Sequence, residues 1–79
     1  MKLLITGGGG FVGARLARTL LARGTLAGQP ITSVVLADQI APPADLLADS
    51  RVSARVGPLL DQCAALADEA FDGVFHLAS

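Results

Sequence analysis

The chain has 79 residues, 52% of them hydrophobic and 4% aromatic, and it contains no Trp or Tyr. This size indicates one small domain or a piece of one, and the apolar content argues against disorder. Seven acidic and six basic residues give a net charge of −1, which argues against binding nucleic acid or an anionic membrane through bulk charge. The apolar stretches are too short for a membrane helix or a signal peptide. The single cysteine, Cys63, can form no internal disulfide and suits a reducing, cytoplasmic setting.

The first predicted strand and the first predicted helix lie close together at the start of the chain. Residues 2–6 form a continuous apolar run, which is typical of a strand covered on both faces in a parallel sheet. Residues 11–23 have the apolar spacing of a helix, and Gly24 suits the position just past its end. The apolar stripe of this helix comprises Val12, Leu16, Ala17, Leu20 and Leu21. Residues 24–30 are predicted to form a loop.

The rest of the chain continues the alternation of strands and helices. It predicts a strand at 31–37, a short helical turn at 44–48 and an edge strand at 51–56. A helix at 59–70 and a final apolar strand at 74–78 follow. Strands that alternate with helices favour right-handed crossovers and a parallel sheet. The expected fold class is therefore α/β with a parallel sheet.

The sequence TGGGGFVG, residues 6–13, places glycines between the first strand and the first helix. Gly7 lets the chain leave the strand in a tight turn, Gly10 removes a side chain where a pyrophosphate would lie, and Gly13 lets the helix pack against the strand. The amides around Phe11 and Val12 have no partners within the helix, and with the positive end of its dipole they form an anion site. The alternative is a glycine-rich turn without a ligand, but the strand–helix context favours a nucleotide site.

Asp38 is the second mark of a dinucleotide site. It follows the second predicted strand, about 25 residues after Gly13 against about 20 in the usual pattern, and the loop at 24–30 accounts for the difference. Its carboxylate would accept hydrogen bonds from the adenosine ribose and repel a 2′-phosphate, and no arginine stands next to it in the sequence. The pattern favours NAD over NADP, and an FAD- or NADP-binding Rossmann protein is a further alternative. The alternative is an Asp that merely ends a strand.

Three motifs, in this order, resemble those of the extended short-chain dehydrogenase/reductases, the NAD-dependent epimerase/dehydratase family. TGGGGFVG resembles the family's TGxxGFxG fingerprint, VLAD ending in Asp38 resembles its second-strand acid, and GVFHLAS at 73–79 resembles its fourth-strand segment HLAA. Within the family, the segments MKLLITGG, ARGTLAGQPIT and FDGVFHLAS are most similar to the D-erythronate dehydrogenase type, which oxidises a sugar-acid hydroxyl with NAD.

The resemblance implies that residues 1–79 form a Rossmann NAD-binding half-domain, the amino-terminal part of a longer enzyme. This half-domain is the first half of a doubly wound parallel sheet with strand order 3-2-1-4. NAD and a small sugar or sugar acid are the implied ligands, and a cytoplasmic homodimer is the expected form of the parent. The residues implied to contact the pyrophosphate and support its helix are Gly7, Gly10, Phe11, Val12 and Gly13. Those implied near the adenosine are Asp38, Gln39 and Leu59. Those implied to lie under the cofactor, where the fourth strand ends, are Leu77, Ala78 and Ser79.

One position departs from the family's pattern. After the third strand the family has an Asp that contacts the adenine amino group, whereas this chain has Gly57-Pro58-Leu59. Pro58 offers neither a carboxylate nor an N–H, although Leu59 can cover the adenine face. The usual polar contact to adenine is therefore missing from the predicted site, and Asp61 is a candidate substitute.

The family's chemistry requires a Tyr-x-x-x-Lys pair and a Ser or Thr, with the Tyr as the acid/base on the substrate hydroxyl. This chain has no Tyr, Lys2 is its only Lys, and Ser79 matches the strand motif rather than the catalytic hydroxyl. No catalytic residue or metal ligand is assigned, and His76, inside an apolar strand, is expected to be structural. The expected function is the NAD-binding part of an oxidoreductase or epimerase acting on a sugar or sugar acid. The alternative is a non-catalytic NAD sensor or scaffold.

Overall fold

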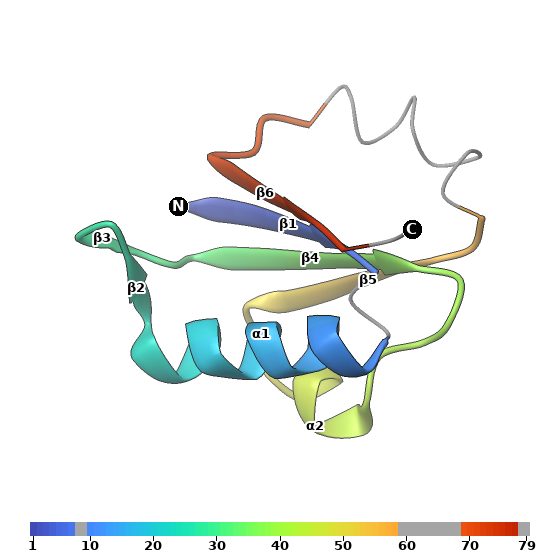
Figure 1. Ribbon diagram of the computed structural model, residues 1–79. Helices are drawn as coiled ribbons and strands as arrows, with labels where there is room; N and C mark the ends of the chain where they lie inside the picture. Colours follow the sequence, from blue (N-terminus) through green and yellow to red (C-terminus); the bar gives the residue numbers. More distant parts are fainter. Residues whose placement is uncertain (8–9, 59–68, 78–79) are drawn as a thin grey trace.

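Four parallel strands form the main sheet of the computed structural model, which describes residues 1–7, 10–58 and 69–77 (Figure 1). Their order across the sheet is β5-β4-β1-β6, and every neighbouring pair is parallel. The strands are β1 Lys2–Thr6, β4 Ser33–Asp38, β5 Val52–Val56 and β6 Gly73–His76. The predicted strand order 3-2-1-4 is therefore confirmed, because β1, β4, β5 and β6 are the four strands expected from the sequence.

The register brings the carboxyl ends of all four strands to one edge of the sheet. Thr6 on β1 lies opposite Ala37 on β4 and His76 on β6. Asp38 at the end of β4 lies opposite Val56 at the end of β5. In open parallel sheets, ligands bind outside this edge, where the strand order reverses.

Helix α1, Phe11–Arg23, has the bounds predicted from the sequence (Figure 1). It ends at Gly24, whose φ of 73° is left-handed and whose N–H donates to the carbonyl of Leu20 at 2.9 Å. The residues buried on α1 are Gly13, Ala14, Ala17, Leu20 and Leu21. The placement of Val12 in the buried stripe was wrong, because this side chain is 63% exposed. Gly13 and Ala14 face the sheet in the first turn, and Val12, about 100° from Gly13 around the helix, points outward.

The loop predicted for residues 24–30 is an antiparallel hairpin in the structure, made of β2 Thr25–Leu26 and β3 Gln29–Pro30. Ala27 and Gly28 form its two-residue turn, with φ values of 53° and 78°. Positive φ at both central positions is typical of the tight hairpin turn whose twist matches its strands. Alanine is unusual there, and the sequence therefore carries no strong signal for this hairpin.

The other elements differ from the predicted bounds at their ends. β4 starts at Ser33 rather than at Ile31, because the N–H of Ile31 donates to the carbonyl of Gly24 at 2.8 Å and not to a strand of the main sheet. Helix α2, Ala44–Leu47, confirms the short helical turn after the proline pair. The helix predicted for 59–70 lies mostly outside the described residues, and its last two, Glu69 and Ala70, are not helical. No helix of the described part of the chain is long and apolar enough to cross a membrane.

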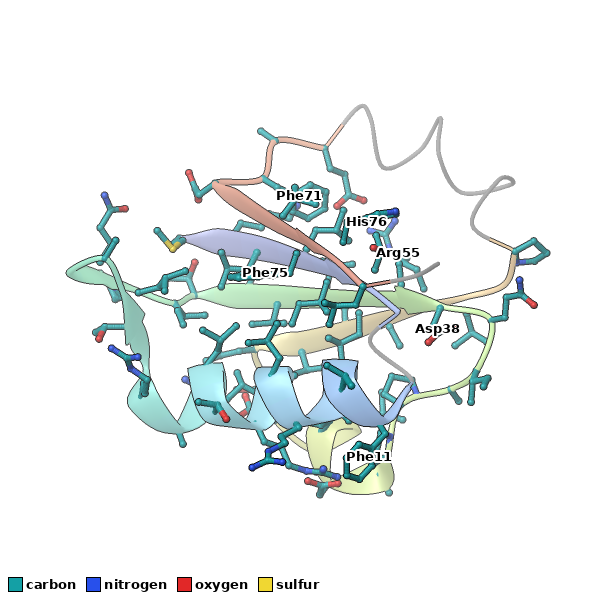
Figure 2. All side chains as sticks on the ribbon, viewed as in Figure 1. Phe11, Asp38, Arg55, Phe71, Phe75 and His76 are labelled. Carbon is teal, nitrogen blue, oxygen red and sulfur yellow. The ribbon has the colours of Figure 1, made fainter. Side chains whose placement is uncertain are left out.

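The core has one large and one small apolar cluster, on opposite faces of the sheet. The large cluster joins the sheet to α1 and α2, and its buried residues are Leu3, Ile5, Ala14, Ala17, Leu20, Leu21, Ile31, Val34, Leu36 and Leu46. The small cluster contains Leu4, Val35 and Ala37, with Phe71 packed against it. Helices α1 and α2 thus cover one face (Figure 1), while residues 69–72 lie on the other, where Figure 2 shows Phe71.

Candidate nucleotide-binding site

Gly7 makes the tight turn at the end of β1. Its φ is 83°, a left-handed conformation that side chains other than glycine adopt at a cost. Its N–H donates to the carbonyl of Ala37 on β4 at 2.7 Å, and its own carbonyl accepts the N–H of Gly10 at 3.1 Å. The chain therefore leaves the sheet while still bonded to the neighbouring strand, and it reaches the start of α1 within three residues.

The amino terminus of α1 presents backbone amides at this edge of the sheet. Gly10 is the N-cap in an extended conformation, with φ −80° and ψ 171°, and it supplies no capping side chain. The N–H of Ala14 donates to the Gly10 carbonyl at 2.9 Å, so the amides of Phe11, Val12 and Gly13 precede the first bond of the helix. The first turn has no acidic side chain, and the helix end therefore keeps its partial positive charge.

The side chains of Phe11 and Val12 point into solvent. Phe11 is 84% exposed and Val12 63% exposed, and Figure 2 shows Phe11 pointing away from the sheet. A contact of these two residues with a nucleotide would therefore come from the backbone. Gly13 is buried against the sheet, as its predicted packing role requires.

Gly10 and Asp38 come together from two different elements. A Cβ on Gly10 would lie 3.4 Å from the Gly7 carbonyl oxygen and 4.0 Å from Oδ2 of Asp38, which are ordinary contacts. Its negative φ also suits any residue. The fold itself therefore tolerates a side chain at Gly10, whereas a phosphate that approaches this backbone closely does not. The glycine at this position fits a ligand better than it fits a structural need.

Asp38 is half-buried at the end of β4, where both its side chain and its backbone are bonded. Its Oδ1 accepts the N–H of Gln39 at 2.6 Å, which orients the carboxylate. Its carbonyl accepts the N–H of Gly57 at 2.9 Å, just past β5. The carboxylate therefore has a fixed direction beside the glycine turn, and the side chain of Gln39 is exposed next to it.

The remaining predicted site residues lie at the ends of β5 and β6. The N–H of Leu77 donates to the carbonyl of Thr6 at 3.0 Å, which places Leu77 beside the end of β1. Pro58, the departure from the family's pattern, is exposed just past β5. Three predicted contacts, Leu59, Ala78 and Ser79, lie outside the described residues.

Thr6 belongs to this edge and was not predicted. Its side chain is 6% exposed, its Oγ1 lies 2.7 Å from Nδ1 of His76, and it reaches the Phe75 carbonyl at 3.5 Å. This pairing agrees with a structural role for His76 and joins β6 to the residue before Gly7. The only sequence signal is that Thr6 and His76 both end strands, and their pairing needs the register to be known.

A parallel sheet with order β5-β4-β1-β6, a glycine turn into a helix and an acid at the end of the next strand define a Rossmann nucleotide-binding unit. The model of the NAD dependent epimerase/dehydratase family matches residues 3–79, and the chain belongs to this family. Its cofactor is NAD.

Two curated relatives match over the whole chain. A D-erythronate dehydrogenase from Cupriavidus necator is 46% identical over an alignment of 87 residues that covers 100% of this chain and 26% of the relative. A D-erythronate dehydrogenase from Haemophilus influenzae is 38% identical over 80 residues that cover 100% of this chain and 24% of the relative. The chain therefore spans about a quarter of the length of these relatives.

Proposed function

We propose that this chain is the amino-terminal NAD-binding part of an oxidoreductase that oxidises a sugar acid, with D-erythronate as the substrate. The main observation in support of the cofactor site is that the amino terminus of α1 at Gly10, which has no side-chain cap, lies next to the carboxylate of Asp38. The substrate class is supported by the names of the two relatives, which are 46% and 38% identical to this chain.

In the proposed complex the pyrophosphate of NAD lies against the turn at Gly7 and Gly10 and accepts hydrogen bonds from the backbone N–H groups of Phe11 and Val12. The partial positive charge of the helix end favours this anion, and a glycine at position 10 leaves room for it. Leu77 would lie under the cofactor at the end of β6.

At the adenosine end, Asp38 accepts hydrogen bonds from the ribose hydroxyls, and Gln39 lies beside it. The N–H of Gln39 already occupies Oδ1 of Asp38, while Oδ2 faces the glycine turn. A 2′-phosphate here would meet the carboxylate at close range, and like charges repel at such distances. The site therefore favours NAD over NADP.

Bound NAD would accept a hydride from a carbinol carbon of the substrate. The proton must go to another group, and the family's acid/base Tyr with its Lys is not found in this sequence, which has no Tyr. We propose that the rest of the protein supplies that pair, with residues 1–79 acting as the cofactor half-domain. A cytoplasmic, homodimeric enzyme of sugar-acid metabolism is the corresponding proposal for the whole protein.

The test is the reaction of the whole protein with D-erythronate and NAD, followed by NADH absorbance and by chromatography of the sugar acid. We expect NADH and an oxidised product in equal amounts, with D-threonate as the control for stereochemistry. An epimerised product without net NADH would overturn the oxidation and favour an epimerase. Tight NAD binding without any change in the sugar acid would favour the non-catalytic sensor.

A further inference from the structure

Residues 69–72, named the strap here, run along the sheet face opposite α1 and lead directly into β6. Figure 2 shows Phe71 of the strap on that side of the sheet. Its ring packs against Leu4, Val35 and Ala37, which form the small apolar cluster of this face. The strap therefore covers part of a face that the two helices do not reach.

Lys2 at the start of β1 contacts three of the four strap residues. Its N–H donates to Oδ2 of Asp72 at 2.6 Å, and its carbonyl accepts the N–H of Asp72 at 2.8 Å. Its Nζ lies 5.1 Å from the centre of the Phe71 ring and 3.2 Å from Oε2 of Glu69. A cation over an aromatic face and beside a carboxylate is attracted to both.

Glu69 connects the strap to a second strand. Its Oε1 accepts a hydrogen bond from Nη2 of Arg55 on β5, while Lys2 lies on β1, and β4 runs between those two strands. The Glu69 side chain is 20% exposed, less than that of either cation, at 37% for Lys2 and 38% for Arg55. One carboxylate thus pairs with two cations on strands that are not neighbours.

The two oxygens of Glu69 depend differently on their partners. Within the described residues, Oε2 is buried and has no aligned hydrogen bond, so the ammonium of Lys2 is its compensating charge. The hydrogen bond from Arg55 is the main cause that lowers the pKa of Glu69, and Lys2 lowers it further. Removing the Lys2 charge would leave a buried carboxylate oxygen without compensation, which is costly.

We propose that Lys2 and Glu69 form an electrostatic latch that holds the strap on the sheet and thereby keeps β6 paired with β1. β6 has four residues, and in the described part of the chain it pairs with β1. A strand this short gains few backbone bonds of its own, so its pairing depends on what anchors the chain just before it. Releasing Glu69 leaves the strap held only by the packing of Phe71 and by the bonds between the Lys2 backbone and Asp72. The strap and then β6 therefore open more often, while α1 and β4 keep their own packing.

Arg18 and Asp45 provide a matched ion pair away from the strap. They form two hydrogen bonds, at 2.8 and 2.9 Å, between α1 and α2. Their side chains are 49% and 58% exposed, and exposed pairs contribute little to stability. The Asp45→Asn variant therefore removes an ion pair whose geometry is better than that of the Lys2–Glu69 pair, and it leaves the strap unaltered.

The test is amide hydrogen exchange, resolved by peptide, on the full chain and on the Glu69→Gln, Lys2→Met, Lys2→Arg and Asp45→Asn variants. We expect Glu69→Gln and Lys2→Met to speed exchange at 73–77 about tenfold while α1 and β4 exchange as before. Lys2→Arg keeps the charge and restores protection, and Asp45→Asn leaves 73–77 unchanged.

The proposal is overturned if exchange at 73–77 does not change in Glu69→Gln, which is nearly isosteric. It is also overturned if exchange rises equally in α1, β4 and β6, since the latch would then be a general stabiliser. Faster exchange at 73–77 in Asp45→Asn would show that any lost ion pair loosens β6. Because the readout needs no NAD, each result stands apart from the proposed cofactor site.

Discussion

Gly10 and Asp38 face each other across the carboxyl edge of the sheet, with a Cβ on Gly10 reaching within 4.0 Å of Oδ2 of Asp38. One belongs to the amino terminus of α1 and the other ends β4. A ligand at this edge would meet helix amides next to Gly10 and a carboxylate at Asp38. In the proposed complex the amides bind the pyrophosphate and the carboxylate binds the ribose.

Replacing Gly10 separates the needs of the fold from those of the ligand. In Gly10→Ala the added Cβ makes only ordinary contacts and the φ of −80° is unstrained, so we expect the Tm to change by less than about 3 °C. NAD affinity should fall about tenfold or more, because the methyl group stands where the phosphate approaches. Titration calorimetry and thermal unfolding on the same preparation measure both quantities.

Gly7→Ala is the control for this prediction, because Gly7 has a φ of 83°. Alanine in that conformation costs about 1–2 kcal/mol, and the Tm should fall by about 5 °C or more. If Gly10→Ala lost as much stability as Gly7→Ala, the glycine at position 10 would be structural. If it bound NAD normally, the proposed path of the pyrophosphate would be wrong.

Replacing Asp38 tests the preference between NAD and NADP. Asp38→Asn keeps an oxygen for the N–H of Gln39 but removes the charge. We expect NAD to bind about tenfold more weakly, since a charged hydrogen bond to the ribose is lost, and NADP to bind more tightly than before. Fluorescence or heat-shift titrations with both nucleotides give the ratio of the two dissociation constants. An unchanged ratio, or equal affinities in the unaltered protein, would remove the role of Asp38.

Much of the fold could be predicted because its signals are local. The bounds of β1 and α1 follow from a continuous apolar run and a helical stripe that a glycine ends. The parallel sheet follows from the alternation of strands and helices, and its strand order follows from the resemblance of the glycine turn and Asp38 to a Rossmann unit. The glycine turn and Asp38 were predictable for the same reason, because their spacing along the chain reflects one βαβ unit.

What could not be predicted depends on unusual backbone or on distant pairs. The β2–β3 hairpin has Ala27 at a φ of 53°, where alanine is rare, so its turn has no sequence signature. The pairing of Thr6 with His76 joins residues 70 positions apart and follows only from the register. The contact of Lys2 with Glu69 is of the same kind, because a charge pattern does not reveal which strands it connects.

The stability of the chain should depend on Asp49 in acid. Hydrogen bonds from the side chain and the backbone of Arg51 lower the pKa of Asp49 to about 2, below the unfolded value of about 3.9. Because the folded state lowers this pKa, the stabilisation is present above about pH 4 and is lost as the pH falls toward about 2. Arg51 also donates to the Leu21 carbonyl at 3.2 Å, so the pair links the start of β5 to α1.

The measurement is the free energy of unfolding of the unaltered protein and of Asp49→Asn at several pH values. We expect the difference between them to be constant near neutral pH and to shrink between about pH 4 and about pH 2. Asp45→Asn, whose exposed partner is Arg18, is the comparison variant. A difference that stays constant down to the lowest pH would contradict the assignment of the lowered pKa to Asp49.

The 79-residue chain by itself should bind NAD and show no dehydrogenase activity. The glycine turn, the start of α1 and Asp38 provide the proposed contacts to the pyrophosphate and the ribose, and all of them lie within residues 1–38. The acid/base on the substrate hydroxyl is a Tyr in this family, and the sequence contains none. Calorimetry with NAD establishes that the chain is folded and loaded, and NADH absorbance with D-erythronate then reports turnover. Turnover by the purified chain would refute the proposal that the acid/base lies outside residues 1–79, because one of the chain's own side chains would have to accept the proton. His76 would be tested first, with the His76→Gln variant.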